Sequence, residues 1–140
     1  MKSAGYSGTP LDKKLGVKAG CRLWLIDAPA GFDTTLGPLP EGVTVVRAKS
    51  RGPACDVIVL FVKTKKELAG GFASAKKRLV ENGGLWVAWP KKASGVDTEL
   101  TEPFVRAHGL TQGLVDNKVC AIDATWSGLR FVIRLVDRKR

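Results

Sequence analysis

An apolar run at residues 86–89 leads through a proline into a loop that holds two lysines, a serine and a glycine. An α/β protein delivers polar groups in this way to the carboxyl edge of its sheet, where such folds bind ligands. Lys91 and Lys92 would supply positive charge at that edge. Ser94 would supply a hydroxyl, and Gly95 a backbone amide that a ligand can approach closely. The loop therefore predicts a site for an anionic or polar ligand.

Three other polar segments also follow predicted strands, namely residues 27–32, 63–64 and 123–128. Because the carboxyl ends of parallel strands meet at one edge of a sheet, we expect these segments to line the same crevice. The side chains that they would contribute to ligand binding are Asp27, Thr64, Asp123, Trp126 and Ser127. A structural interpretation stays open for each, because Ser-Gly pairs form turns in any protein and a tryptophan can cover the end of a core.

No established catalytic motif occurs in the chain, so the catalytic residues stay unknown. The sequence holds no G-x-x-x-x-G-K-[ST] loop, no G-x-G-x-x-G turn and no G-x-S-x-G elbow. The one histidine, His108, is expected in the last turn of a helix. We expect it to act there as a cation near the negative helix end rather than as a catalytic residue. Three widely spaced cysteines, Cys21, Cys55 and Cys120, do not form a cluster of metal ligands, so we expect no metal site.

Length and charge bound the remaining possibilities. A chain of 140 residues predicts one domain over residues 1–140, with residues 1–8 flexible. Its 23 lysines and arginines against 13 acids give a formal charge of +10, which favours anionic partners, although dispersed charge is also typical of solvated surfaces. The apolar runs are too short to cross a membrane, and the first six residues lack the apolar stretch of a signal peptide. We therefore expect a cytoplasmic protein.

The hydrophobic pattern predicts a three-layer, Rossmann-like α/β domain with a mostly parallel sheet of about six strands and an antiparallel C-terminal strand. The expected strands are residues 21–27, 43–47, 56–62, 85–89, 114–123 and 129–135. A T-x-x-E capping box at Thr64 predicts a helix between two of them. Residues 28–42 hold three prolines and three glycines and predict a loop without a regular helix. The short link over residues 48–55 leaves the orientation of the second strand open.

Several blocks resemble a small bacterial family known as domain of unknown function 3052. These blocks are Gly-Tyr-Ser-Gly-Thr-Pro-Leu at 5–11, Leu-Gly-Pro-Leu-Pro at 36–40, Val-Ala-Trp-Pro-Lys-Lys-Ala-Ser-Gly at 87–95, Asp-Asn-Lys-Val-Cys-Ala at 116–121 and Thr-Trp-Ser-Gly-Leu at 125–129. The resemblance spans nearly the whole chain. It implies membership of an uncharacterised family and carries no activity.

The order of the elements is also similar to that of S-adenosylmethionine-dependent methyltransferases. A helix, the segment 17–23, alternating strands and helices, and a closing antiparallel strand look like a trimmed version of such an enzyme. That resemblance implies a glycine-rich turn after the first strand to hold the cofactor. Here Ala28, Pro29 and Ala30 occupy the turn, and a proline has no amide hydrogen to offer. The cofactor therefore stays unknown.

Three function hypotheses follow. The first is a domain that binds an anionic small molecule or nucleotide at the carboxyl edge of the sheet. The second is a methyltransferase-like enzyme with a degenerate cofactor turn, in which Asp27 and Asp123 would be acid/base or ribose-binding groups. The third is a basic protein that binds nucleic acid through its charge surplus. The identity of the ligand and the oligomeric state are not determined by the sequence.

Overall fold

The computed structural model describes residues 9–47 and 52–138 of the chain. Residues 1–8, which the sequence predicts to be flexible, lie outside this part. The described strands are β1 (Arg22–Ile26), β2 (Thr44–Val46), β3 (Cys55–Phe61), β4 (Leu79–Pro90), β5 (Leu114–Ala121) and β6 (Trp126–Ile133). The described helices are α1 (Leu11–Leu15), α2 (Phe32–Leu36), α3 (Lys65–Lys77) and α4 (Glu102–Thr111), with short 3-10 turns at η1 (Lys92–Ser94) and η2 (Leu135–Asp137).

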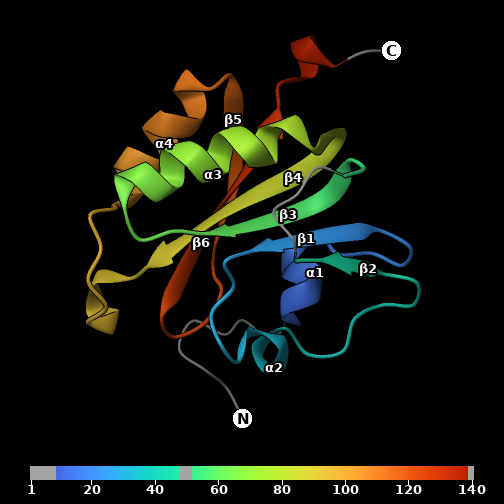
Figure 1. The fold of residues 1–140 in the computed structure, drawn as a ribbon, viewed down its shortest axis with the longest axis horizontal. Coiled ribbons are helices and arrows are strands. Elements are labelled where there is room, and N and C mark those ends of the chain that lie inside the picture. The colour runs from blue at the N-terminus through green and yellow to red at the C-terminus, as the bar shows by residue number, and fades with distance from the viewer. Residues whose placement is uncertain (1–8, 48–51, 139–140) are drawn as a thin grey trace.

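The strands form one sheet in the order β2-β1-β3-β4-β6-β5 (Figure 1). β1 pairs in parallel with β2 and β3, and β3 pairs in parallel with β4. β6 is antiparallel to β4 on one side and to β5 on the other, so β5 runs in the same direction as the first four strands. The predicted sheet, mostly parallel with an antiparallel C-terminal strand, is confirmed. The second strand, whose orientation the sequence left open, is parallel to β1.

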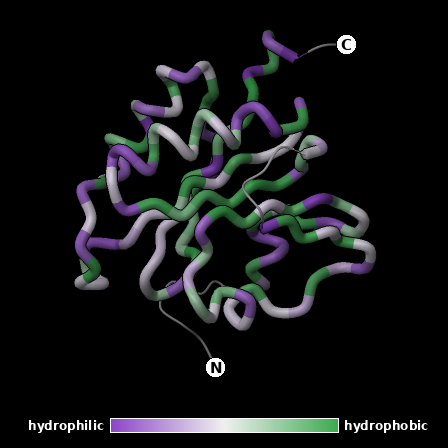
Figure 2. The backbone as a smooth tube through the Cα atoms, in the orientation of Figure 1, coloured by the Kyte–Doolittle hydropathy of each residue, from purple (hydrophilic) through white to green (hydrophobic). Residues whose placement is uncertain are grey.

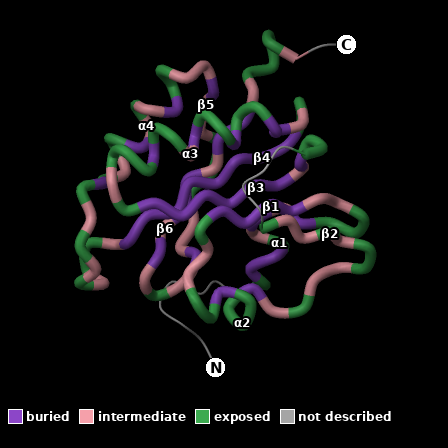
Figure 3. Tube along the Cα trace, in the orientation of Figure 1, coloured by how far each residue is buried: buried purple, intermediate pink, exposed green. Residues whose placement is uncertain are grey.

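Helices cover both faces of the sheet, which gives the predicted three layers (Figure 1). On one face, Leu68 and Phe72 of α3 and Val105 of α4 pack in one hydrophobic core. On the other face, Leu15 of α1 and Phe32 of α2 belong to a second core. The central strands are hydrophobic and buried, whereas exposed residues gather on the helices and loops (Figure 2, Figure 3). Burial on both faces explains why the central strands are unbroken apolar runs.

The cap of α3 follows directly from its sequence. The Thr64 hydroxyl accepts a hydrogen bond from the Glu67 amide at 3.0 Å, and the Glu67 carboxylate accepts from the Thr64 amide at 3.3 Å. The predicted capping box is therefore confirmed. The Glu67 carboxylate also accepts the Lys63 amide at 2.7 Å, so the first turn of α3 is tied to the end of β3.

The prediction that residues 28–42 form a loop without a regular helix is wrong, because they contain α2. Gly31 precedes this helix with a φ of 85°, which glycine adopts without strain. Phe32 and Leu36 are one helical turn apart and both are buried. Their burial in the core, rather than a long amphipathic pattern, stabilises this single turn.

α4 extends beyond His108, which the sequence placed in the last turn of a helix, and includes Gly109 before it ends at Thr111. A Cβ atom at Gly109 would lie 2.0 Å from Cε1 of Phe131 in β6. The lack of a side chain at Gly109 therefore permits the close approach of α4 to the Phe131 ring. No helix formed by the described residues combines the length and apolar character needed to cross a bilayer.

His108 lies on α4 with its ring edge-on to Phe72, the two ring centroids being 5.2 Å apart. Its Nε2 atom is buried and has no hydrogen-bond partner within the described residues. Burial lowers the pKa of His108 and favours the neutral imidazole. The expectation that His108 acts as a cation at the helix end is therefore wrong.

Alanine substitutions at two glycines inside helices are expected to change stability in opposite directions. A Cβ at Gly70 in α3 would meet no atom within 4 Å, so Gly70→Ala should raise the free energy of unfolding. We expect a gain of about 0.5–1 kcal/mol from the lower entropy of the unfolded chain. Gly109→Ala should instead destabilise by about 1–3 kcal/mol or more, because the Phe131 ring must move. Urea denaturation of both variants measures the difference, and a stable Gly109→Ala protein would contradict the packing of α4.

The neutral state of His108 predicts a pH effect on stability. Since its pKa is lower in the folded protein, the unfolded chain binds the proton more readily as the pH falls through about 6.5. The free energy of unfolding should therefore be unaffected by His108 above that pH and should decline below it. Urea denaturation at pH 7.5 and 5.5 should show a smaller decline for His108→Gln than for the parent protein. Equal declines in the two proteins would argue against this assignment.

Candidate functional site

The carboxyl end of β4 and the start of β6 lie side by side. Pro90 is opposite Trp126 in the antiparallel register, and the Lys91 amide donates a hydrogen bond to the Thr125 carbonyl at 2.7 Å. The loop with the lysine pair and the Thr-Trp-Ser segment therefore meet at one edge, as the predicted parallel sheet requires.

A cavity of about 660 Å³ opens at this edge beyond the end of β4. It lies between the loop over residues 91–101, the first residues of α4 and the start of β6. Four of the predicted site residues line it, namely Lys91, Lys92, Gly95 and Ser127. The structure thus gives the lysine loop a concave surface in which a ligand can be held.

The charge of this cavity is mixed rather than uniformly positive. Asp97, Glu99 and Glu102 line it together with the two lysines. The sequence analysis missed these acids, although their spacing in the D-T-E-L-T-E segment at 97–102 could have indicated an acidic wall. A ligand that fits this cavity would carry hydrogen-bond donors or positive charge as well as negative charge.

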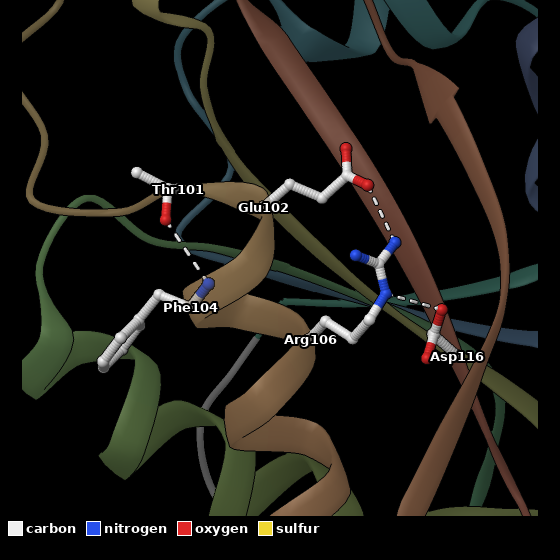
Figure 4. A network of polar contacts seen from close by, with 5 residues as sticks. All are labelled: Thr101, Glu102, Phe104, Arg106 and Asp116. Carbon is white, nitrogen blue, oxygen red and sulfur yellow. Dashed lines mark hydrogen bonds and ion pairs between the residues drawn. The ribbon is translucent and has the colours of Figure 1, made fainter.

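An arginine bridge fixes the helical wall of the cavity. Arg106 Nη2 contacts Glu102 Oε2 at 2.7 Å, and its Nε contacts Asp116 Oδ2 at 2.9 Å (Figure 4). The hydrogen bonds to Glu102 and then Asp116 raise the pKa of Arg106. The Thr101 hydroxyl caps α4 by accepting from the Phe104 amide at 3.3 Å. The bridge joins α4 to β5 and holds Glu102 at the rim.

Some of the predicted ligand-binding groups are used in local structure. Asp123 Oδ1 accepts the amides of Thr125 and Trp126, both at 2.8 Å, and so shapes the turn into β6. Ser94 Oγ donates to the Lys91 carbonyl at 2.6 Å and accepts the Val96 amide at 3.2 Å. These contacts, like the cap formed by Thr64, build the edge of the sheet, and ligand binding by these three residues stays a prediction.

Trp126 is only 7% exposed, so its ring belongs mainly to the core. Its ring lies edge-on to Phe61 at 5.1 Å between centroids, and Phe61 lies edge-on to Phe32 at 4.9 Å. These three rings join the ends of β3, β6 and α2. Trp126 therefore closes the carboxyl end of one core, and the role in ligand binding expected from the sequence stays a prediction.

Asp27 lines a different cavity, of about 410 Å³, between the end of β1 and the first half of α3. Asp27 itself has a φ of 57°, a left-handed conformation that aspartate tolerates better than most residues. Trp24, Ile26 and Leu60 supply apolar lining, and the polar lining includes Glu67 and Ser74.

Hydrogen bonds join the start of α3 to the loop that lines the Lys91 cavity. The Lys63 carbonyl accepts the Thr98 hydroxyl at 2.7 Å and the Glu99 amide at 3.0 Å. The Glu99 carboxylate in turn accepts the Lys65 amide at 2.8 Å. Glu67 in the first turn of α3 lines the Asp27 cavity, whereas Thr98 and Glu99 line the Lys91 cavity.

The turn after β1 has no glycine until Gly31. Pro29 cannot donate a hydrogen bond, and its carbonyl accepts the Phe32 amide at 3.1 Å, which tightens the entry into α2. A Cβ at Gly31 would meet no atom within 4 Å, so the backbone there faces open space.

Comparison with solved structures finds similar folds among methyltransferases. The N-methyltransferase NodS of Bradyrhizobium japonicum matches with a TM-score of 0.59 at 15% identity, covering 90% of this chain and 98% of that one. A SAM-dependent methyltransferase of Aquifex aeolicus matches with a TM-score of 0.58 at 16% identity, covering 87% of each chain. Fibrillarin of Aeropyrum pernix, solved with natively bound S-adenosyl-L-methionine, matches with a TM-score of 0.57 at 15% identity, covering 91% of this chain and 70% of that one.

These identities are low enough that the matches establish the shared fold alone. No family model matches the chain, and no curated protein matches it. The Rossmann-like fold, similar to that of these methyltransferases, is therefore shown. The resemblance to domain of unknown function 3052 stays a prediction.

The structural role of Asp123 in the turn before β6 can be tested without a ligand. Asp123→Ala removes the acceptor for two backbone amides and should lower the free energy of unfolding by about 1–3 kcal/mol without any ligand. Asp97→Ala, which removes an exposed acid from the cavity wall, should change it by about 0.5 kcal/mol at most. Urea denaturation measures both. If the two variants were equally stable, the structural role assigned to Asp123 would be wrong.

Proposed function

We propose that this protein binds S-adenosylmethionine or a closely related adenosine ligand at the carboxyl edge of the sheet, as a methyltransferase-like domain. One observation carries the proposal: two cavities adjoin the carboxyl ends of strands of a sheet in which antiparallel β6 separates β4 from β5. One cavity adjoins the end of β1 and the other the end of β4. This pairing suits a cofactor site beside an acceptor site.

The cavity at Asp27 has the chemistry that a nucleoside requires. The Asp27 carboxylate can accept hydrogen bonds from ribose hydroxyls, as carboxylates at the ends of such strands do. Trp24, Ile26 and Leu60 offer an apolar surface to a purine ring. The volume of about 410 Å³ is in the range of small-molecule sites. The residues present therefore fit the adenosine portion.

The turn at residues 28–30 does not fit the glycine-rich cradle that the methyltransferase resemblance implies. Pro29 supplies no amide, and the alanine side chains restrict close approach of the backbone. The amino-acid portion of the ligand would then depend on other groups, of which the open backbone at Gly31 is the nearest on the chain. When bound, S-adenosylmethionine supplies an electrophilic methyl group.

The Lys91 cavity would hold a polar acceptor. Lys91 and Lys92 can attract negative charge on it, and the carboxylates of Asp97 and Glu99 can accept its hydrogen bonds. The mixed charge favours a small polar or zwitterionic molecule over a purely anionic one. It also places acids where a proton of an acceptor amine or hydroxyl could be received.

Calorimetric titration with S-adenosylhomocysteine tests the proposal. We expect saturable binding that Asp27→Asn weakens about tenfold or more, because the charged acceptor is lost. Asparagine tolerates the left-handed backbone of position 27, so the fold should persist. Asp97→Asn is the matched control and should leave the affinity unchanged. Absence of heat at millimolar ligand, or equal effects of both variants, would overturn the proposal.

A second candidate is a binding domain for an anionic small molecule without catalysis, located at Lys91 and Lys92. The proline in the turn after β1 favours it, since that residue disfavours the cofactor mode of methyltransferases. A thermal-shift panel of nucleotides and phosphorylated metabolites separates the two candidates. Stabilisation by such a ligand that Lys91→Ala removes, in the absence of binding to S-adenosylhomocysteine, would select this second candidate.

A further inference from the structure

A basic cavity of about 390 Å³ lies at the amino edge of the sheet, away from the site proposed above. It lies where β1, β3 and β4 begin, and residues of α1, β5 and β6 complete its wall. Its basic residues are Lys13, Lys14, Lys18, Lys118 and Arg130. None of these residues is among the ligand-binding residues predicted from the sequence, because they come from separate parts of the chain.

The cavity has little negative charge to balance these cations. Asp56 is the only acidic residue among those that line it, and its Oδ2 accepts the Arg22 amide at 2.8 Å. Neither Lys13 nor Lys18 forms an ion pair with another described residue. The side-chain amides of Asn82 and Asn117 add neutral hydrogen-bonding groups. The lining is therefore suited to an anion with several oxygen atoms.

Arg130 is the most informative member of the cluster. Its side chain is half-buried, and its Nη1 atom donates a hydrogen bond to Asn117 Oδ1 at 3.3 Å. No described carboxylate forms an ion pair with it. Burial and then the charge of Arg138 lower the pKa of Arg130, which reflects a cation whose charge is poorly compensated.

The sequence of β4 makes room for this guanidinium group. A Cβ at Gly84 would lie 2.3 Å from Arg130 Nε, so only glycine permits the arginine to lie across β4. The arginine therefore lies half-buried at this edge without a described carboxylate partner, where an anion can neutralise its charge.

The backbone of α1, which carries Lys13 and Lys14, is fixed on the sheet by two hydrogen bonds. Trp86 Nε1 donates to the Leu15 carbonyl at 3.0 Å through a buried contact, which anchors the end of α1 on the sheet. Lys118 Nζ donates to the Lys14 carbonyl at 3.1 Å and ties β5 to the same helix. Pre-positioned charges bind an anion with a smaller entropic penalty than mobile ones.

We propose that this cavity binds a ligand with at least two linked phosphate groups. Cations on α1, β5 and β6 surround the cavity, so they match charge spread over two phosphates better than one small anion. Arginine and lysine are the side chains that bind phosphate in most proteins. This site does not depend on the function proposed for the carboxyl edge.

Calorimetric titration with inorganic pyrophosphate at low ionic strength tests the site. We expect one saturable site per chain, with an affinity that falls as salt rises. Lys118→Ala and Lys18→Ala should each weaken binding about tenfold. Lys77→Ala removes an equal charge from an exposed position on α3, on the opposite face, and should leave the affinity unchanged.

A more direct variant is Arg130→Gln, which keeps hydrogen-bonding capacity but removes the charge. Because the Arg130 side chain is half-buried, the circular dichroism spectrum and urea midpoint of the variant are compared with those of the parent protein. If the variant unfolds, Lys18→Ala, which changes an exposed residue, still tests whether the cavity binds pyrophosphate. Asp27→Asn should not affect pyrophosphate binding, which separates this test from that of the carboxyl edge.

The phosphates could belong to a small molecule or to a nucleic-acid backbone, and a second titration distinguishes these sources. A single-stranded oligonucleotide that binds more tightly than pyrophosphate, with a steeper salt dependence and the same sensitivity to Lys18→Ala, would assign the site to a nucleic-acid backbone. Pyrophosphate binding without oligonucleotide binding would assign it to a small phosphorylated ligand. The proposal would be overturned if neither probe bound, or if Lys77→Ala lowered the affinity for pyrophosphate as much as Lys18→Ala does.

Discussion

The antiparallel pairing of β6 between β4 and β5 is the constraint on which the remaining structure depends. It requires small residues where the strands cross the core. Gly128 lies opposite Ala88, and a Cβ on it would lie 2.9 Å from Ile122 Cδ1 and 3.1 Å from Trp86 Cε3. The space left by these small residues lets the Trp86 indole fill the core and reach the Leu15 carbonyl. One strand pairing thus fixes both the N-terminal helix and the carboxyl edge.

The same pairing gives the two ends of the sheet different electrostatics. At the carboxyl edge it brings the lysine loop next to the turn shaped by Asp123, and the acids of residues 97–102 balance the lysines. At the amino edge it carries Arg130 over Gly84 and beside the lysines of α1, where little negative charge compensates. The cavities at the two edges therefore differ in the balance of their lining charges. Two ligands of different chemistry follow more naturally from this division than one.

Parts of this fold could be predicted because their signals are local. The capping box at Thr64 and the unbroken apolar runs of β3 and β4 each reflect contacts within a few residues or burial on both faces. α2 was missed because one helical turn has no periodicity to detect, and its stability comes from burying Phe32 and Leu36. The lowered pKa of His108 was missed because the burial that causes it comes from tertiary packing, which includes the ring of Phe72 on α3.

Hydrophobic periodicity and capping act over short distances, so the class of the fold, the approximate strands and the polar segments after them can be predicted from the residues alone. Which of those segments line a common cavity depends on how the strands pair in three dimensions. That pairing places Lys91 and Ser127 at one cavity and Asp27 at another. The tertiary structure alone also assembled the basic cavity, since its cations lie more than a hundred positions apart along the chain, from Lys13 to Arg130, and meet only when the sheet forms.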